Sequence, residues 1–130
     1  MIFRKFKKKE IEKPSYLDRI DELEKVSVIR LKGDIDQVTI PIIEKRITEN
    51  RRLGSTIDKN ILVDYAQVGK IDSAAVAFHL IRLKEYEAKG YRVGFTNVSD
   101  TLRTYLKMFQ LSDTFKIYSS EAEAVLELNQ

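Results

Sequence analysis

Cysteine is absent from this 130-residue sequence, and histidine occurs only once. Without cysteine the chain has no disulfide, no thiolate metal site and no nucleophilic thiol. A single histidine excludes metal sites that need two histidine ligands. The sequence therefore offers little catalytic chemistry, and we expect His79 to be a surface or partly buried side chain of a helix rather than a catalytic group.

Glycine-rich motifs and long apolar runs are lacking as well. The 5 glycines form neither a P-loop nor a dinucleotide-binding fingerprint, so the chain is not expected to cradle a nucleotide. No stretch of about 18 apolar residues could span a bilayer, and residues 1–13 lack the apolar segment of a secretory signal. We expect a soluble, cytoplasmic protein that needs no cofactor or metal and is not an enzyme.

The apolar content is high enough for one hydrophobic core, since 43% of the residues are hydrophobic. Charge is distributed unevenly: residues 1–13 hold six basic and two acidic residues, a net charge of +4, and the remainder carries −1. Pro14 marks the expected boundary between a basic N-terminal tail, residues 1–14, and a single domain, residues 15–130. We expect a solvated tail; weak electrostatic contact with anionic lipid or nucleic acid is the alternative.

Strand and helix patterns alternate along the domain. The expected strands span residues 16–23, 26–32, 60–65, 91–96 and 115–118, with a hairpin turn near residues 24 and 25. The expected helices span about 40–53, 73–89, 99–109 and 120–128, with Thr39, Ser99 and Ser120 as N-caps and Gly90 as a stop signal. This order predicts an α/β fold, a mixed β-sheet of about five strands with about four helices.

The stretch from Val68 to Phe78 is the most informative part of the chain. A buried strand is expected to end in a loop, Gly69 to Ser73, that leads into the second helix, whose inward side we expect to carry Ala74, Ala77, Phe78, Leu80 and Ile81. Asp72 and Ser73 are both good N-cap residues. A phosphate on Ser73 would face free N–H groups and the positive end of the helix dipole, so Ser73 is either a cap alone or a phosphorylation switch.

Several segments together resemble the STAS domain of bacterial anti-sigma factor antagonists and sulfate transporter tails. The resemblance covers about residues 15–128 and rests on the order and spacing of residues 28–36, 61–64, 68–77, 90–93, 102–103 and 111–115.

The resemblance implies a serine that a partner serine kinase, the anti-sigma factor, phosphorylates and a phosphatase resets. Ser73 matches this phosphoacceptor, and the protein would release a sigma factor, as a cytoplasmic phosphoprotein that regulates transcription. The residues that would contact the partner are Gly69, Lys70, Asp72, Ser73, Ala74 and Ala75, with Asp36 and Thr39 from the loop before the first helix. Ala75 and Ala77 stand where the family usually has glycines, which stiffens the helix start and adds two methyl groups.

Three other functions remain open at this point. The domain could be an unphosphorylated scaffold in a transporter or lipid-transport complex, or a module that binds a small ligand or nucleotide. The basic tail could also bind nucleic acid electrostatically. Asp34 and Asp36 could in principle bind a hard cation, although carboxylates at a strand end more often cap loops.

Overall fold

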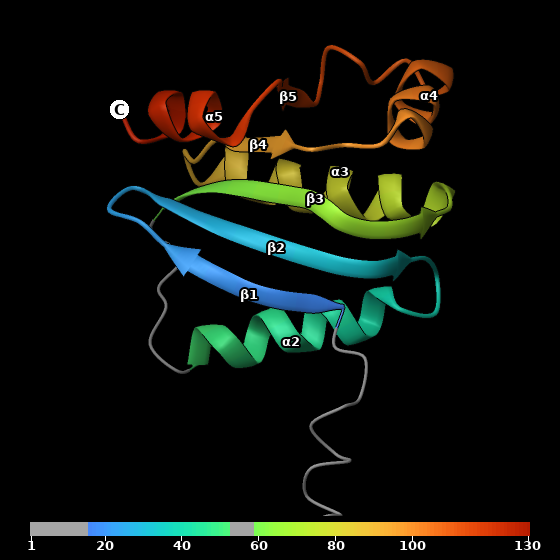
Figure 1. The fold of residues 1–130 in the computed structure, drawn as a ribbon, viewed down its shortest axis with the longest axis horizontal. Helices are drawn as coiled ribbons and strands as arrows, with labels where there is room; N and C mark the ends of the chain where they lie inside the picture. Colours follow the sequence, from blue (N-terminus) through green and yellow to red (C-terminus); the bar gives the residue numbers. More distant parts are fainter. Residues whose placement is uncertain (1–15, 53–58) are drawn as a thin grey trace, which may run out of the picture.

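The computed structural model describes residues 16–52 and 59–130, so the expected basic tail lies outside the described residues. Strands and helices alternate along the chain (Figure 1). The elements are β1 (Leu17–Glu22), β2 (Val26–Ile35), α2 (Ile40–Arg52), β3 (Asn60–Ile71), α3 (Ser73–Ala88), β4 (Val93–Thr96), α4 (Asp100–Met108), β5 (Lys116–Tyr118) and α5 (Glu121–Leu128). No helix within these ranges is long and apolar enough to cross a membrane.

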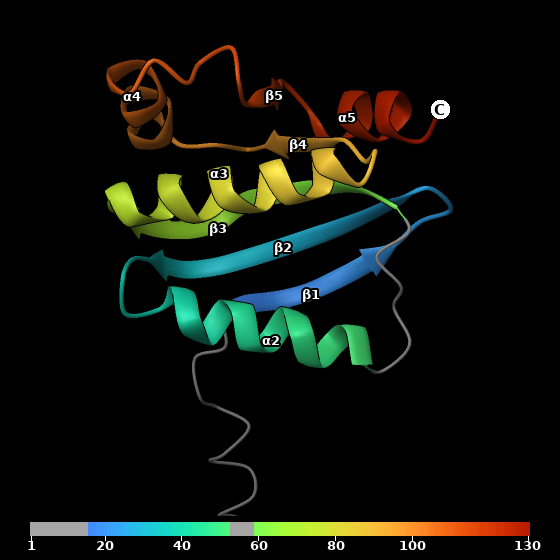
Figure 2. The same cartoon turned by 180° about the vertical axis from the view of Figure 1, so that it is seen from behind.

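The sheet has 5 strands in the order β1-β2-β3-β4-β5. β1 pairs with β2 in antiparallel fashion, and the other neighbours are parallel. The expected mixed α/β sheet is therefore confirmed. α2 and α3 lie on one face of the sheet (Figure 2), and α5 lies on the other (Figure 1). β3 is the central strand, and its apolar run Ile61–Val63 is buried, as its composition indicates; Asp64 and Tyr65 after it are buried as well.

Two apolar clusters hold these layers together. The larger one joins α2, α3 and α4 to the sheet around Phe95, whose ring stacks on Phe115 with centroids 5.2 Å apart. The smaller one lies beneath α5, and its buried members are Val26, Val28, Leu62, Tyr118, Ala124 and Leu128. The caps predicted from the sequence are confirmed for α4 and α5, because Ser99 accepts a hydrogen bond from Leu102 N and Ser120 accepts one from Glu123 N.

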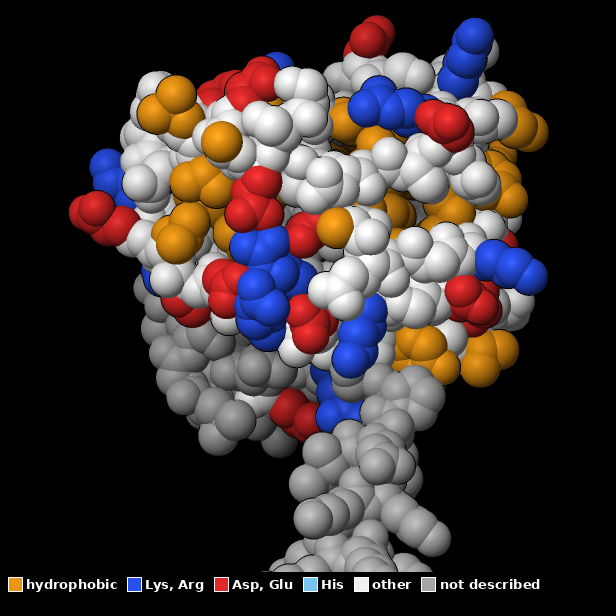
Figure 3. All heavy atoms as spheres, viewed as in Figure 1, with side chains coloured by type: hydrophobic (Ala, Val, Ile, Leu, Met, Phe, Trp, Pro, Cys, Tyr) orange, Lys and Arg blue, Asp and Glu red, His pale blue; other side chains and the backbone are white. Residues whose placement is uncertain are grey.

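The face that carries α5 also carries an ion cluster centred on Arg30 of β2. Its guanidinium lies 2.6 Å from Asp21, 2.8 Å from Asp64 and 2.6 Å from Glu121 at the start of α5. Burial alone would raise the pKa of Asp64, but hydrogen-bond donors led by Asn97 and including Arg30 hold that pKa below its usual value. Figure 3 shows basic and acidic side chains gathered over the middle of this face. The cluster ties β1, β2, β3 and α5 together.

The inward side of α3 differs from the expected one. Its buried residues are Ala75, Val76, Phe78, His79, Leu83 and Tyr86. The prediction was wrong for Ala77 and Ile81, which are exposed, Ile81 by 58%. The larger side chains Phe78, Leu83 and Tyr86 fix the rotation of the helix, and this rotation turns Ala77 and Ile81 outward.

The expectation that His79 is a surface or partly buried residue was also wrong, because its side chain is 4% exposed and lies in the core. His79 Nε2 shares a hydrogen bond with the Tyr65 hydroxyl. Burial lowers the pKa of His79 to about 3, and burial likewise raises the pKa of Tyr65. Both groups are therefore uncharged in the folded protein at neutral pH.

This burial predicts an acid-sensitive stability. Below about pH 6.5 the unfolded chain protonates His79 whereas the folded chain does not, so stability is fully present above that pH and falls by about 1.4 kcal/mol per unit as the pH drops toward the folded pKa. Urea unfolding between pH 7 and pH 5 should therefore show a loss of about 2 kcal/mol in the wild type. In His79→Gln this loss should disappear, because glutamine does not titrate. An equal loss in both proteins would show that His79 is not the group responsible.

Candidate functional site

β3 continues further than the sequence indicated. It runs to Ile71, so that Asp72 alone separates it from α3, and the expected loop from Gly69 to Ser73 was wrong. The reason is pairing with β2, in which Gly33 lies opposite Val68 and Ile35 lies opposite Ile71. The start of α3 is thus fixed directly by the sheet.

Asp72 is the N-cap of α3. It adopts an extended backbone conformation, and its side chain accepts a hydrogen bond of 2.9 Å from Ala74 N. Ser73 is consequently the first residue of the helix and is exposed to solvent. Among the described residues its hydroxyl has no hydrogen-bond partner. The structure therefore assigns capping to Asp72 and leaves the Ser73 hydroxyl unengaged.

The loop between β2 and α2 lies beside this helix start. Asp34 Oδ1 accepts a hydrogen bond of 2.8 Å from Lys70 N, and Asp72 N donates to Ile35 O at 3.3 Å. Within the loop, Asp36 Oδ1 accepts from the N–H groups of residues 38 and 39 at 2.9 Å each, and the Thr39 hydroxyl donates to Asp34 O at 2.8 Å. Both carboxylates are thus engaged with backbone N–H groups, and the described residues include no group of three metal-ligating side chains.

The predicted contact residues divide into surface and interior positions. Gly69, Lys70 and Ser73 are exposed, and Asp36, Asp72 and Ala74 are partly exposed. Ala75 and Thr39 are buried, with exposures of 0% and 5%. Ala75 packs into the core and Thr39 uses its hydroxyl inside the loop, so neither side chain is presented at the surface of this chain, and their contact with a partner stays a prediction.

Ala75 and Ala77, which stand where the family usually has glycines, therefore have different consequences. The methyl group of Ala75 points into the core and adds apolar packing there. Ala77 is exposed, so its methyl group is the one that changes the outer surface of α3.

Sequence reasoning missed a set of exposed apolar residues on α3 and at the start of α2. Its residues are Val38 (76% exposed), Ile42 (38%), Ala77 and Ile81 (58%), which we call the apolar end surface. The N-terminal ends of α2 and α3 lie at the same end of the sheet (Figure 2). On α3, residues 73, 77 and 81 follow at intervals of four and share one side of the helix. A helical projection anchored on Phe78, Leu83 and Tyr86 would have identified this side.

Asp34 was considered only as a cation ligand or loop cap, and in the structure it links the end of β2 to the end of β3 through Lys70 N. A Cβ atom at Gly69 would lie 2.6 Å from Asp34 Oδ1. Gly69→Ala should therefore displace this carboxylate, leave Lys70 N without its partner and lower the free energy of unfolding by about 1 kcal/mol.

A double-mutant cycle checks the cause. Asp34→Ala removes the obstructing oxygen, so Gly69→Ala should have little further effect in that background when both are followed by urea unfolding. A cost of Gly69→Ala that is independent of Asp34 would contradict the proposed clash.

Comparison with solved structures identifies the fold. The anti-sigma factor antagonist SpoIIAA of Bacillus in its unphosphorylated form is 24% identical, with a TM-score of 0.66 over 85% of this chain and 95% of its own. An anti-sigma factor antagonist from Mycobacterium paratuberculosis is 21% identical, with a TM-score of 0.70 over 90% and 97%. The murine anion transporter Slc26a9 is 14% identical, with a TM-score of 0.67 over 86% of this chain but only 19% of its own.

A family model described as the STAS domain matches residues 19–124. This match includes β2, the whole of β3 and the helix start at Ser73. Because it spans most of the sequence, the chain belongs to the STAS domain family.

Proposed function

We propose that this protein is an anti-sigma factor antagonist, and that phosphorylation of Ser73 controls its binding to an anti-sigma factor serine kinase. The observation that carries this proposal is the position of Ser73, an exposed first residue of α3 whose hydroxyl is unengaged because Asp72 supplies the cap. A kinase can approach such a hydroxyl without unfolding the helix. The kinase supplies Mg²⁺ and the catalytic base, and Ser73 is the substrate.

The charge around Ser73 makes phosphorylation an effective switch. Asp34, Asp36 and Asp72 already gather at this end of the sheet, with Lys70 as the nearby cation on β3. A phosphate adds about −1.5 to −2 charges to this acidic surface. Burial of these charges against a partner is unfavourable unless the partner matches them with cations.

The apolar end surface supplies the attraction that the phosphate would oppose. Ala77 and Ile81 follow Ser73 along the same side of α3, and Ile42 lies on the neighbouring helix. A partner that covers these residues also covers Ser73, which stands at the end of the row. Modification would therefore place a charge within the area that the partner covers, next to these apolar side chains.

SpoIIAA supports the proposal by analogy, because the anti-sigma factor antagonist has been solved in unphosphorylated and phosphorylated forms. Its fold is shared by this chain over 95% and 96% of its length in the two forms.

The proposal predicts different behaviour of three variants toward an anti-sigma factor kinase of the source cell. Ser73→Ala should bind it as the wild type does, whereas Ser73→Glu should bind at least about tenfold more weakly because it places a charge in the contact. Thr101→Glu is the matched control, since Thr101 is an exposed residue in the first turn of α4. It should bind normally. Isothermal titration calorimetry measures all four affinities.

A kinase assay with ATP and Mg²⁺ completes the test. Intact mass should increase by one phosphoryl group, about 80 Da, in the wild type and in Thr101→Glu but not in Ser73→Ala. Undiminished binding of Ser73→Glu, together with an unchanged mass of the wild type, would contradict the proposal.

A scaffold role in a transport complex is the second candidate, and the likeness to the STAS region of an anion transporter favours it. In that case membrane transport subunits should be recovered equally by wild-type, Ser73→Ala and Ser73→Glu proteins from detergent extracts. Ser73 would then remain unmodified.

A further inference from the structure

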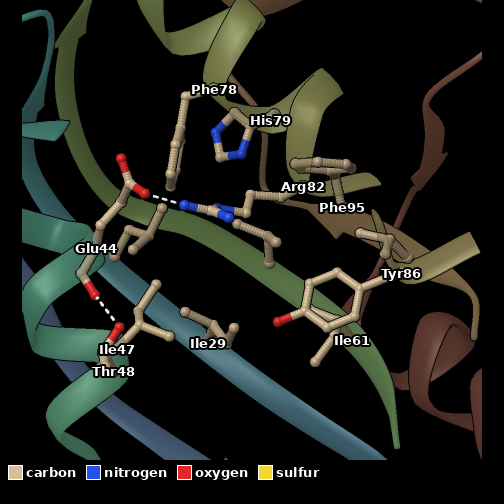
Figure 4. A pocket seen from close by; sticks show the side chains of 13 residues that line it. Ile29, Glu44, Ile47, Thr48, Ile61, Phe78, His79, Arg82, Tyr86 and Phe95 are labelled. Carbon is tan, nitrogen blue, oxygen red and sulfur yellow. Dashed lines mark hydrogen bonds and ion pairs between the residues drawn. The ribbon is translucent and has the colours of Figure 1, made fainter. Parts of the chain in front are cut away.

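A cavity of about 110 Å³ lies between α2, α3 and the sheet, away from Ser73. Its floor consists of aliphatic side chains of the strands, among them Ile29, Ile61 and Val63. Phe78 closes it from α3 and Ile47 from α2 (Figure 4). Protein interiors are close-packed, and few voids exceed one water molecule. This space approaches the size of engineered apolar cavities of about 150 Å³ that bind benzene.

The residues that line the cavity disfavour a charged ligand. His79, which lines the cavity, and its hydrogen-bond partner Tyr65 behind it are both buried and uncharged at neutral pH. The charged side chains at its rim, Glu44 and Arg82, pair with each other. A charged ligand would therefore lose its hydration without gaining a free counter-charge, whereas an apolar ligand would gain contact with the strand side chains.

An ion pair lies at the rim of the cavity. Arg82 of α3 reaches across to Glu44 of α2 (Figure 4), and both side chains are partly exposed, by 37% and 39%. Within the part of α2 whose side chains the structure describes, residues 40–49, Ile43 is the one buried side chain. Ile40 and Ile47 are only partly buried against the core, whereas α3 has six buried residues, so α2 separates from the sheet more readily than α3 does.

We propose that this cavity binds a small uncharged molecule of benzene or toluene size, aromatic or short aliphatic, which enters when the pair of Glu44 and Arg82 opens and α2 moves away from α3. Binding uses the existing space and rests on apolar contact. It is independent of any modification at Ser73.

Toluene and benzoate test the ligand class on the full chain. Toluene titrated into methyl-labelled protein should give saturable NMR shifts at Ile29, Ile61 and Val63, and should raise the melting temperature with increasing concentration. Benzoate, which carries the same ring with a charge, should bind at least about tenfold more weakly. Absence of saturable shifts with toluene, or equal affinity for benzoate, would overturn the proposal.

Two matched variants test the location. Ile47→Phe places a ring into the cavity from a partly exposed position and should abolish the toluene shifts. Ile81→Phe makes the same change on the exposed side of α3 and should leave them intact. Toluene binding by folded Ile47→Phe with wild-type affinity would show that the site lies elsewhere. If Ile47→Phe does not fold, the contrast between toluene and benzoate in Ile81→Phe and the wild type decides the proposal.

A second pair of variants tests the ion pair at the rim. Glu44→Gln weakens the contact across the rim, so toluene should exchange faster than in the wild type, as measured by NMR line shape. Glu85→Gln removes the other carboxylate that contacts Arg82, at 3.0 Å on the same helix, and should leave exchange unchanged. Equal exchange rates in Glu44→Gln and Glu85→Gln would contradict the role of the rim pair.

Discussion

The parallel pairing of β2 with β3 is the constraint on which this end of the molecule depends. It continues past the covered centre of the sheet to the pair Ile35 and Ile71, so both strands end at the same edge. The loop after β2 and the N-cap residue Asp72 after β3 are then adjacent, and Asp34 on one strand reaches the backbone N–H of Lys70 on the other. Gly69 leaves room for that carboxylate. The start of α3 is therefore held by the sheet itself, and Ser73 is presented at a fixed position.

The acidic groups at this edge have structural roles before any partner arrives. Asp34, Asp36 and Asp72 each accept at least one backbone N–H, so their positions are set within the free protein. Such preorganisation reduces the ordering entropy that association would otherwise cost. A phosphate at Ser73 would thus act on a preformed surface, and its effect would be electrostatic and steric rather than a refolding of the helix start.

Local patterns predicted much of this fold, and nonlocal packing determined the rest. The apolar run of β3, the serine caps of α4 and α5 and the glycine stop after α3 are signals carried by neighbouring residues, and the structure bears them out. The extension of β3 through Gly69 and Lys70 could not be predicted, because neither residue favours a strand and the extension depends on hydrogen bonds to β2. The inward side of α3 was misjudged for a related reason. Hydropathy favours Ile81 over His79 as a core residue, whereas the Tyr65 hydroxyl makes His79 acceptable inside.

The helices α2 and α3 line the cavity and also carry the exposed residues near Ser73. α2 and α3 enclose the cavity near Glu44 and Arg82, and they also carry Ile42, Ala77 and Ile81 of the apolar end surface. A molecule that changes the separation of these helices would also change how Ile42 and Ile81 lie relative to each other. A partner bound across both residues would favour one separation and hence one occupancy of the cavity. Because such coupling is reciprocal, the ligand would alter partner affinity by the same factor as the partner alters ligand affinity.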